Sequence, residues 1–215
     1  MKSQLRLLPA ILILAGGAIA YGGPDVSKAP SPEEIIRRFA AKEAEFRDVW
    51  AKYAYMQRIL FQVLGRNNEP TEQRELILEV YFTNDGKRQT RKVSDRGAIT
   101  SVGITEEDLS DATHLAPFVL TTEDLPRYEI KYRGKEQVDE LDTYVFDVEP
   151  RKKVKGERYF EGRIWVDDID FQIVMTRGKA VPDYHNNKFP KFETRREQID
   201  GDYWFPTWTL SLIHI

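Results

Sequence analysis

The spacing of apolar residues changes once along the chain, from helical to alternating. Between residues 32 and 50 apolar side chains recur three or four positions apart, which predicts one amphipathic helix. Ser31 can cap this helix, Pro32 suits its first position, and Glu34 would complete a capping box. The apolar positions are Ile35, Ile36, Phe39, Phe46, Val49 and Trp50. We expect the charged residues to lie largely on the other side: Arg37, Arg38, Lys42, Glu43, Glu45 and Arg47.

From Tyr53 onward apolar and polar residues alternate, which is typical of strands. Asp85-Gly86 predicts a hairpin, and a second, short helix is expected from about Thr105 to Leu115. The expected strands cover residues 53–63, 75–84, 87–93, 127–133, 143–149, 158–167, 171–179, 192–199 and 203–209. After residue 126 the connections are too short for crossover helices, so neighbouring strands should be antiparallel. The predicted fold class is α+β, with one open, curved antiparallel sheet packed on the long helix and the short one.

The first twenty residues have the layout of a secretory signal peptide. Lys2 and Arg6 precede an apolar run, and small residues end at Ala20, where cleavage is expected. The run is shorter than the roughly 20 residues of a spanning helix, so an uncleaved anchor is the weaker alternative. We therefore expect residues 1–20 to be removed, residues 21–31 to form a flexible leader, and residues 32–209 to form one domain.

Composition narrows the classes of function. The chain has 32 Lys and Arg against 35 Asp and Glu, a net charge of −3 that becomes −5 when Lys2 and Arg6 are removed with the signal peptide. An acidic chain with both signs interspersed has no electrostatic footprint for nucleic acid. Cysteine is absent, so the chain cannot be lipidated on a cysteine, and its stability must come from one apolar core. We expect no nucleic-acid partner, and we expect that the protein is not itself a lipoprotein.

The last six residues, LSLIHI, follow a strand pattern without an intervening turn. The hexapeptide resembles the translation of a transposon end that is used in preparing sequencing libraries. We expect residues 210–215 to be a non-native tail and the domain to be truncated at its C-terminal end. A genuine short last strand is the alternative.

Three acids, Asp167, Asp168 and Asp170, lie between two apolar strand patterns. Their spacing suits a metal or catalytic cluster, or a tight turn in which carboxylates bond nearby backbone N–H groups. The turn is the better interpretation, because a calcium loop needs more oxygen ligands and a glycine at fixed spacing. His185, in a long polar loop, has no second histidine or cysteine nearby to complete a zinc site. We therefore predict no catalytic residue, no metal site and no cofactor.

Three stretches carry a family resemblance: DELDTYVFDVEP, RYFEGRIWVDDIDFQIV and KFPKFETRREQIDGDYWFPT. Together with the preceding helix and long first strand, they resemble the outer-membrane lipoprotein-sorting family, the LolA-like proteins with LolB and the N-terminal part of RseB. The resemblance runs from about residue 32 to Thr209. It implies a half-barrel sheet that holds helices over its concave side, with an apolar cavity for acyl chains. The family's cavity arginine has no identifiable position in this chain.

The resemblance implies a function in the periplasm. We expect a non-enzymatic carrier or sensor that binds lipid or lipoprotein acyl chains, with an envelope protein as a further partner. The residues expected to line the cavity are Ile59, Phe61, Leu78, Val80, Phe82, Phe146, Trp165, Phe171 and Ile173. Two alternatives stay open: an envelope metal-dependent hydrolase that uses the region of Asp167, Asp168 and Asp170 with His185, and an interaction module whose sheet edge pairs with a partner strand.

Overall fold

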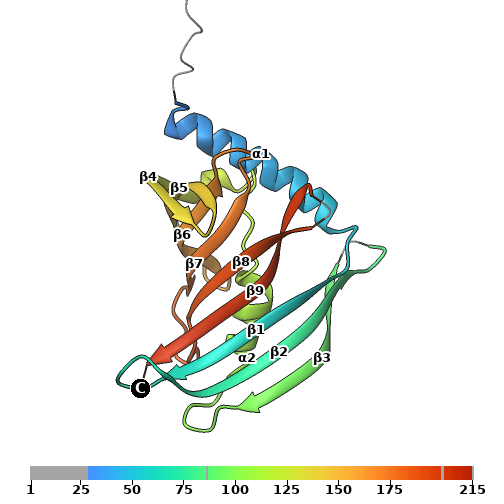
Figure 1. The fold of residues 1–215 in the computed structure, drawn as a ribbon, viewed down its shortest axis with the longest axis vertical. Coiled ribbons are helices and arrows are strands. Elements are labelled where there is room, and N and C mark those ends of the chain that lie inside the picture. The colour runs from blue at the N-terminus through green and yellow to red at the C-terminus, as the bar shows by residue number, and fades with distance from the viewer. Residues whose placement is uncertain (1–28, 86, 200, 215) are drawn as a thin grey trace, which may run out of the picture. The chain divides into compact units, whose positions relative to one another are not determined.

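Within residues 29–85, 87–199 and 201–214, which the computed structural model describes, nine strands form one open sheet with helices over one face (Figure 1). The strand order is β3-β2-β1-β9-β8-β7-β6-β5-β4, so β3 and β4 form the two edges. The strands are β1 (Tyr55–Leu64), β2 (Pro70–Phe82), β3 (Arg88–Ala98), β4 (Tyr128–Val138), β5 (Leu141–Pro150), β6 (Tyr159–Asp167), β7 (Ile173–Val181), β8 (Lys191–Ile199) and β9 (Tyr203–His214). The helices are α1 (Pro32–Trp50), α2 (Glu106–Ser110), a π-helix (Asp111–Leu115) and a 3-10 helix (Leu125–Arg127). The expected α+β class with an open, curved sheet is confirmed.

The sheet consists of two antiparallel meanders joined through one parallel pair. Strands β1 to β3 form the first meander and β4 to β9 the second, with consecutive strands antiparallel as predicted. Strand β9 pairs with β1 in parallel, from Arg58 opposite Trp208 to Leu64 opposite His214. The expectation of a wholly antiparallel sheet is corrected at this junction. The argument from short connections applies only to strands that follow each other in sequence, and β1 and β9 do not.

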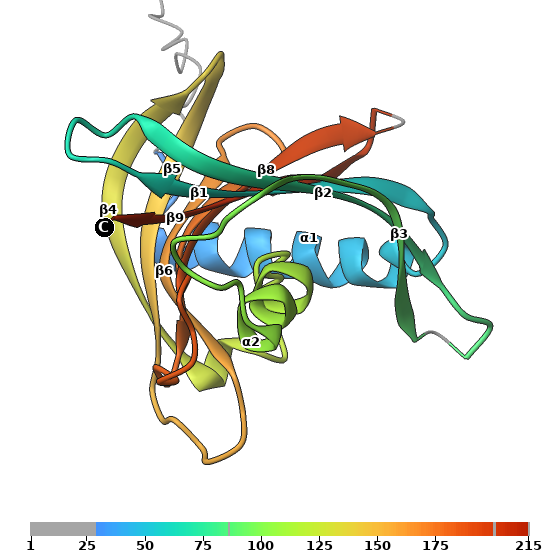
Figure 2. The same ribbon diagram turned by 90° about the horizontal axis from the view of Figure 1, so that it is seen from below.

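Residues 99–127 connect the two edges of the sheet. They leave β3 at one edge and enter β4 at the other. The connection therefore crosses the concave face and carries α2 and the π-helix along it, on the same side of the sheet as α1 (Figure 2). We call α1 together with residues 99–127 the helical cover. The apolar core lies between this cover and the sheet.

Local sequence explains where α1 begins. The Ser31 hydroxyl accepts a hydrogen bond from the backbone N–H of Glu34 at 3.2 Å, and Pro32 occupies the first helical position. The expected second half of the capping box is replaced, because the Glu34 carboxylate accepts hydrogen bonds from Arg37 and Arg38. These pairs stabilise the first turns of the helix.

Two strands extend further than the alternation of residues predicts. Strand β2 begins at Pro70 rather than Glu75, and β3 continues to Ala98 rather than Val93. Most side chains of β3 are exposed, so no buried apolar face marks it in the sequence. The predicted short helix is confirmed, but as α2 followed by a separate π-helix.

Residues 210–214 continue β9 beyond its expected end. They lie opposite residues 60–64 of β1, and the Ser211 hydroxyl lies 3.1 and 2.6 Å from the carbonyl oxygens of Phe189 and Lys191. The described part of this tail is thus a paired strand, whereas its non-native origin stays a prediction.

Some sequence predictions fall on residues that the structure does not describe. The predicted signal peptide, the leader up to residue 28, and Gly86 of the predicted hairpin turn lie outside the described residues. In the part of the chain that is described, no helix is both long enough and apolar enough to cross a membrane.

Candidate functional site

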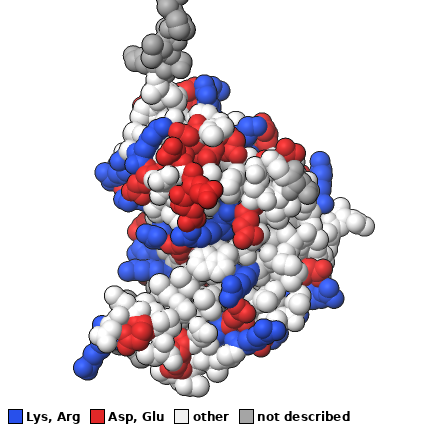
Figure 3. All heavy atoms as spheres, in the orientation of Figure 1, with Lys and Arg blue, Asp and Glu red and all other residues white. Residues whose placement is uncertain are grey.

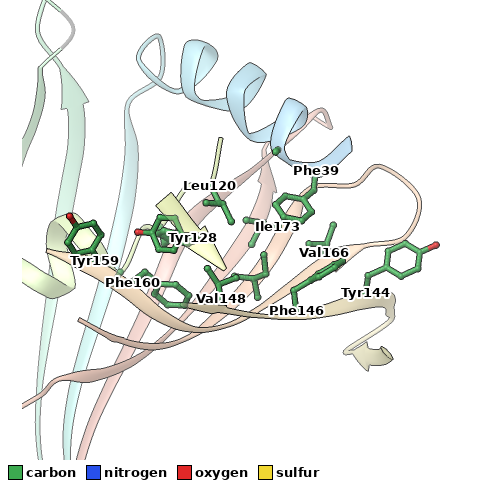
Figure 4. Close-up of a cluster of buried hydrophobic side chains, with 14 of the residues drawn as sticks. Phe39, Leu120, Tyr128, Tyr144, Phe146, Val148, Tyr159, Phe160, Val166 and Ile173 are labelled. Carbon is green, nitrogen blue, oxygen red and sulfur yellow. The ribbon is translucent and has the colours of Figure 1, made fainter. Parts of the chain in front are cut away.

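Large aromatic rings fill the space between the sheet and the helical cover, which we call the interlayer (Figure 4). Phe39 of α1 faces Phe146 of β5 with ring centroids 5.6 Å apart, and neither side chain is exposed. Phe118 of the cover stacks on Phe160 of β6 at a centroid distance of 4.4 Å. The burial of such rings contributes much of the free energy that holds the cover on the sheet.

Eight of the nine residues that were predicted to line a cavity lie in the interlayer. They belong to three buried apolar clusters or pack against them. The eight are Ile59, Phe61, Leu78, Val80, Phe82, Phe146, Phe171 and Ile173. Five of them are 0 % exposed: Ile59, Phe61, Val80, Phe146 and Ile173. Neighbouring atoms therefore fill the space around these five side chains, and a guest molecule could enter only if the cover moved.

Trp165, the ninth residue, lies on the outer face of the sheet. It is opposite Val145 on β5 and Met175 on β7, and it packs with both. Its neighbour Ile164 instead belongs to the cluster that faces the cover. Successive side chains of a strand point to opposite faces, so Trp165 cannot share a cavity with Phe146. We correct the prediction accordingly and leave Trp165 out of the candidate site.

A buried ion pair crosses the interlayer. Arg196 of β8 donates to both carboxylate oxygens of Glu43 on α1 at 2.9 Å, and the two side chains are 1 % and 0 % exposed. Arg196 also donates to the backbone carbonyl of Phe118 at 2.6 Å, and its guanidinium lies 5.1 Å from the ring centre of Phe46. One side chain of the sheet thus holds both parts of the helical cover.

The sequence reasoning missed this ion pair. It placed Glu43 largely on the polar side of the helix, which is wrong because Glu43 is fully buried. Glu43 comes four residues after Phe39 and three before Phe46, the spacing of a single helix face. A carboxylate on an apolar face needs a buried partner, and that requirement was the signal for an inward-facing arginine such as Arg196.

A second set of polar contacts holds α2 to the loop between β7 and β8. Asp108 is 1 % exposed, and one of its oxygens accepts the backbone N–H groups of Lys188 and Phe189 at 2.8 and 2.7 Å. Asp111, the first residue of the π-helix, forms an ion pair with Arg158 just before β6. The rare π-helical geometry often occurs at functional sites. The middle of the helical cover is therefore fixed by two buried carboxylates.

The three acids between β6 and β7 form a turn. One oxygen of Asp167 accepts the backbone N–H groups of Ile169 and Asp170 at 3.0 and 2.9 Å. Asp168 instead accepts a hydrogen bond from Lys135 at 2.7 Å. The predicted hairpin turn is confirmed. Burial raises the pKa of the Asp167 carboxyl, and the two backbone N–H groups offset only part of that shift.

The structure does not bring these acids together with His185. The acids precede β7, whereas His185 follows its C-terminal end in an exposed loop. The nine residues of β7 span about 30 Å at 3.3 Å per residue. Among the residues described, no three His, Asp or Glu side chains are grouped so that they could hold a metal ion.

Charged side chains of both signs are interspersed on the face shown in Figure 3. Elsewhere in the described chain, charged side chains form ion pairs between neighbouring strands, such as Arg177 with Glu193 at 2.6 Å and Arg163 with Asp147 at 2.9 Å. Exposed pairs of this kind contribute little stability individually. Acidic side chains gather in the upper part of this face with basic side chains beside them, so neither sign covers the face alone.

No protein-family model matches the chain, and no curated protein matches it. Among solved structures, a DUF1329 family protein from Desulfovibrio piger is similar with a TM-score of 0.40 and 14 % identity, over 82 % of this chain and 84 % of that chain. An outer membrane lipoprotein-sorting protein domain from Vibrio parahaemolyticus is similar with a TM-score of 0.34 and 15 % identity, over 77 % of this chain and 81 % of that chain. At these scores neither likeness carries an argument about function, which rests on the geometry of the chain itself.

Proposed function

We propose that the protein is a non-enzymatic periplasmic carrier or sensor that binds lipid or lipoprotein acyl chains in the interlayer. Export would use the signal peptide predicted for residues 1–20. The observation that carries the proposal is the construction of the interlayer: a broad apolar sheet face is closed by helices, and a few buried side-chain anchors hold them there. The proposed contact residues are Ile59, Phe61, Leu78, Val80, Phe82, Phe146, Phe171 and Ile173.

The way in which the cover is attached supports this proposal. Its anchors are the Glu43–Arg196 pair, the Asp111–Arg158 pair and the side-chain contacts of Asp108. A cover held by side chains can shift while the hydrogen-bonded ladder of the sheet stays intact. Opening would then expose the apolar concave face to a ligand without unfolding the strands.

An acyl chain can replace the apolar contacts that opening would remove. Burying one methylene is worth about 0.8 kcal/mol, so ten methylenes contribute about 8 kcal/mol. That free energy must offset both the lost packing of the cover and the entropy of association. Affinity should therefore climb with chain length and respond weakly to salt.

Titration with fluorescent fatty acids of increasing length tests the proposal, beside native mass spectrometry of protein purified from cell envelopes. We expect co-purified lipid and tighter binding of longer chains. Phe82→Gln should lower the affinity about tenfold, because an unpartnered polar group in an apolar site costs about 1–3 kcal/mol. Trp208→Gln is the matched control, since Trp208 is half-buried like Phe82 but lies on the outer face. Its affinity should equal that of the unmodified protein.

Three results together would remove the carrier proposal: no bound lipid, no dependence on chain length, and equal affinities of the Phe82→Gln and Trp208→Gln variants. Loss of binding in Trp208→Gln alone would instead point to a site on the outer face of the sheet. Circular dichroism of each variant establishes that the comparison is made between folded proteins.

The two alternative functions receive less support. A hydrolase would use Asp167, Asp168 and Asp170, whose carboxylates bond turn N–H groups and Lys135. An interaction module would offer β3 or β4 to a partner strand. Both edges are rich in charged residues and have an irregular register with their neighbouring strand, and these features protect natural sheet edges from further pairing.

A further inference from the structure

Several hydrogen-bonding groups without partners converge where α1 ends and where β1 and β3 begin. Among the described residues, the indole N–H of Trp50, the hydroxyl of Tyr55, and the Nε and Nη1 groups of Arg88 are buried without a hydrogen-bond partner. The Trp50 and Tyr55 rings lie 6.2 Å apart, and the Arg88 guanidinium lies 6.0 Å from the Trp50 ring centre. Native proteins rarely leave buried polar groups unpaired, so a cluster of them indicates a missing acceptor.

Arg88 is the charged member of this cluster. Its remaining nitrogen donates to the side-chain oxygen of Gln57, a neutral group, at 2.9 Å. Arg91, three residues later on the same strand, forms an ion pair with Glu79 at 2.6 Å, but within the described residues Arg88 forms none. An arginine has five N–H donors and always carries its charge. A largely buried guanidinium without a counter-ion is unfavourable and will attract an anion.

The electrostatic surroundings of Tyr55 also indicate an uncompensated positive charge at Arg88. Burial raises the pKa of the Tyr55 phenol, and the charge of Arg88, the nearby N–H groups of Arg88 and Trp50, and the charge of Arg196 oppose that shift. Arg196 is neutralised by Glu43, whereas Arg88 is not. The cluster therefore combines one uncompensated positive charge with the hydrogen-bond donors of Trp50 and Tyr55.

Apolar side chains of the interlayer pack beside Tyr55 and Trp50. Tyr55 belongs to the buried cluster that contains Phe46, Val80 and Phe205, with Phe82 packed against it. The arrangement offers a charged end and an apolar continuation, which is the pattern of an amphiphile with one anionic group.

We propose that Arg88, Tyr55 and Trp50 bind the carboxylate of a single-chain fatty acid whose tail lies in the interlayer. A carboxylate fits because its single negative charge matches the one uncompensated cation, and its oxygens can accept several N–H and O–H groups at once. Trp50 is half-buried, so its ring forms the boundary that the ligand has to displace. This inference rests on the proposed function and narrows its ligand class to free carboxylic acids.

The test compares two ligands of equal chain length, decanoic acid and decanol, by calorimetric titration at neutral pH. The unmodified protein should bind the acid at least about tenfold more tightly, because hydrogen bonds to charged groups are worth about that factor or more. Arg88→Met should abolish the preference by weakening only the acid. Tyr55→Phe, which keeps the ring, should reduce the preference several-fold. Arg91→Gln removes the same charge from an exposed position of β3 and should leave the preference unchanged.

Equal affinities for acid and alcohol in the unmodified protein would overturn the headgroup site. The headgroup site would also be overturned if Arg88→Met kept the full preference for the acid over the alcohol. The same holds if Arg91→Gln lost that preference as far as Arg88→Met did. If both ligands bind with the same chain-length dependence, the acyl-chain function stands while the carboxylate site fails. If neither ligand binds, both proposals fail together.

Discussion

Glu43 illustrates how the surroundings of one residue decide its contribution. In water the carboxylate would be solvated at little cost, but on the buried face of α1 it depends on Arg196, which is itself buried. Removing a single partner of such a pair leaves an uncompensated charge in an apolar environment. The pair therefore couples the position of α1 to the inward-facing side of β8.

We predict that Glu43→Gln lowers the free energy of unfolding by about 3–5 kcal/mol, because it leaves the Arg196 guanidinium buried without a counter-ion. The double variant Glu43→Leu with Arg196→Met should recover most of this loss, since apolar side chains of similar size then fill the space. Urea denaturation at neutral pH measures both effects.

The control for this prediction is Glu45→Gln on the same helix. Glu45 pairs with Lys42 at 2.7 Å, but both side chains are exposed, so the loss should stay below about 1 kcal/mol. A Glu43→Gln variant as stable as Glu45→Gln would show that the buried ion pair does not hold the cover.

The first turns of α1 show how an element depends on pH. Hydrogen bonds from Arg37 and then Arg38 lower the pKa of Glu34 from 4.5 to about 2. A carboxyl whose pKa is lowered by folding stabilises the folded state above its unfolded pKa, and this contribution is lost as the pH falls through the folded pKa. The relevant window therefore runs from pH 4.5 down to about 2.

We predict that the unmodified protein loses more stability than Glu34→Gln across this window, with the difference reduced at high salt because the group is exposed. Urea unfolding at a series of acidic pH values, at low and high ionic strength, measures it. Parallel stability curves for the two proteins would contradict the assignment of this acid-sensitive contribution to Glu34.

At the scale of elements, the sequence predicts the bounds of those helices and strands that bury one face. The bounds of α1 follow from Ser31, Pro32 and the apolar spacing, and the turn at Asp167 follows from the preference of Asp for backbone N–H groups. The full length of β3 was missed because both of its faces are largely exposed. Periodicity carries information only where one side of an element meets the core.

At the scale of the whole molecule, the sequence does not reveal which distant strands pair. The parallel junction of β1 with β9 and the path of residues 99–127 from one edge to the other depend on contacts between segments far apart in the chain. Eight of the nine candidate site residues, which the family resemblance implied, lie on the concave face. Trp165 lies on the outer face, because its neighbours Ile164 and Val166 both face the cover and successive side chains of a strand alternate.

The central claim is that an acyl chain binds between the helical cover and the sheet, and tryptophan fluorescence tests it most directly. Trp50 lies in the interlayer, whereas Trp165 and Trp204 pack on the outer face and Trp208 lies beside them. Two variants separate the signals. One keeps Trp50 and replaces the other three tryptophans by Phe, and the other carries only Trp50→Phe.

A fatty acid that carries bromine on its chain quenches only tryptophans close to it. We predict saturable quenching in the variant that keeps Trp50, with a midpoint that shifts to lower ligand concentration as the chain lengthens, and no saturable quenching in Trp50→Phe. Saturable quenching of the outer tryptophans with Trp50 unaffected would contradict the account, because it would place the chain on the opposite face of the sheet.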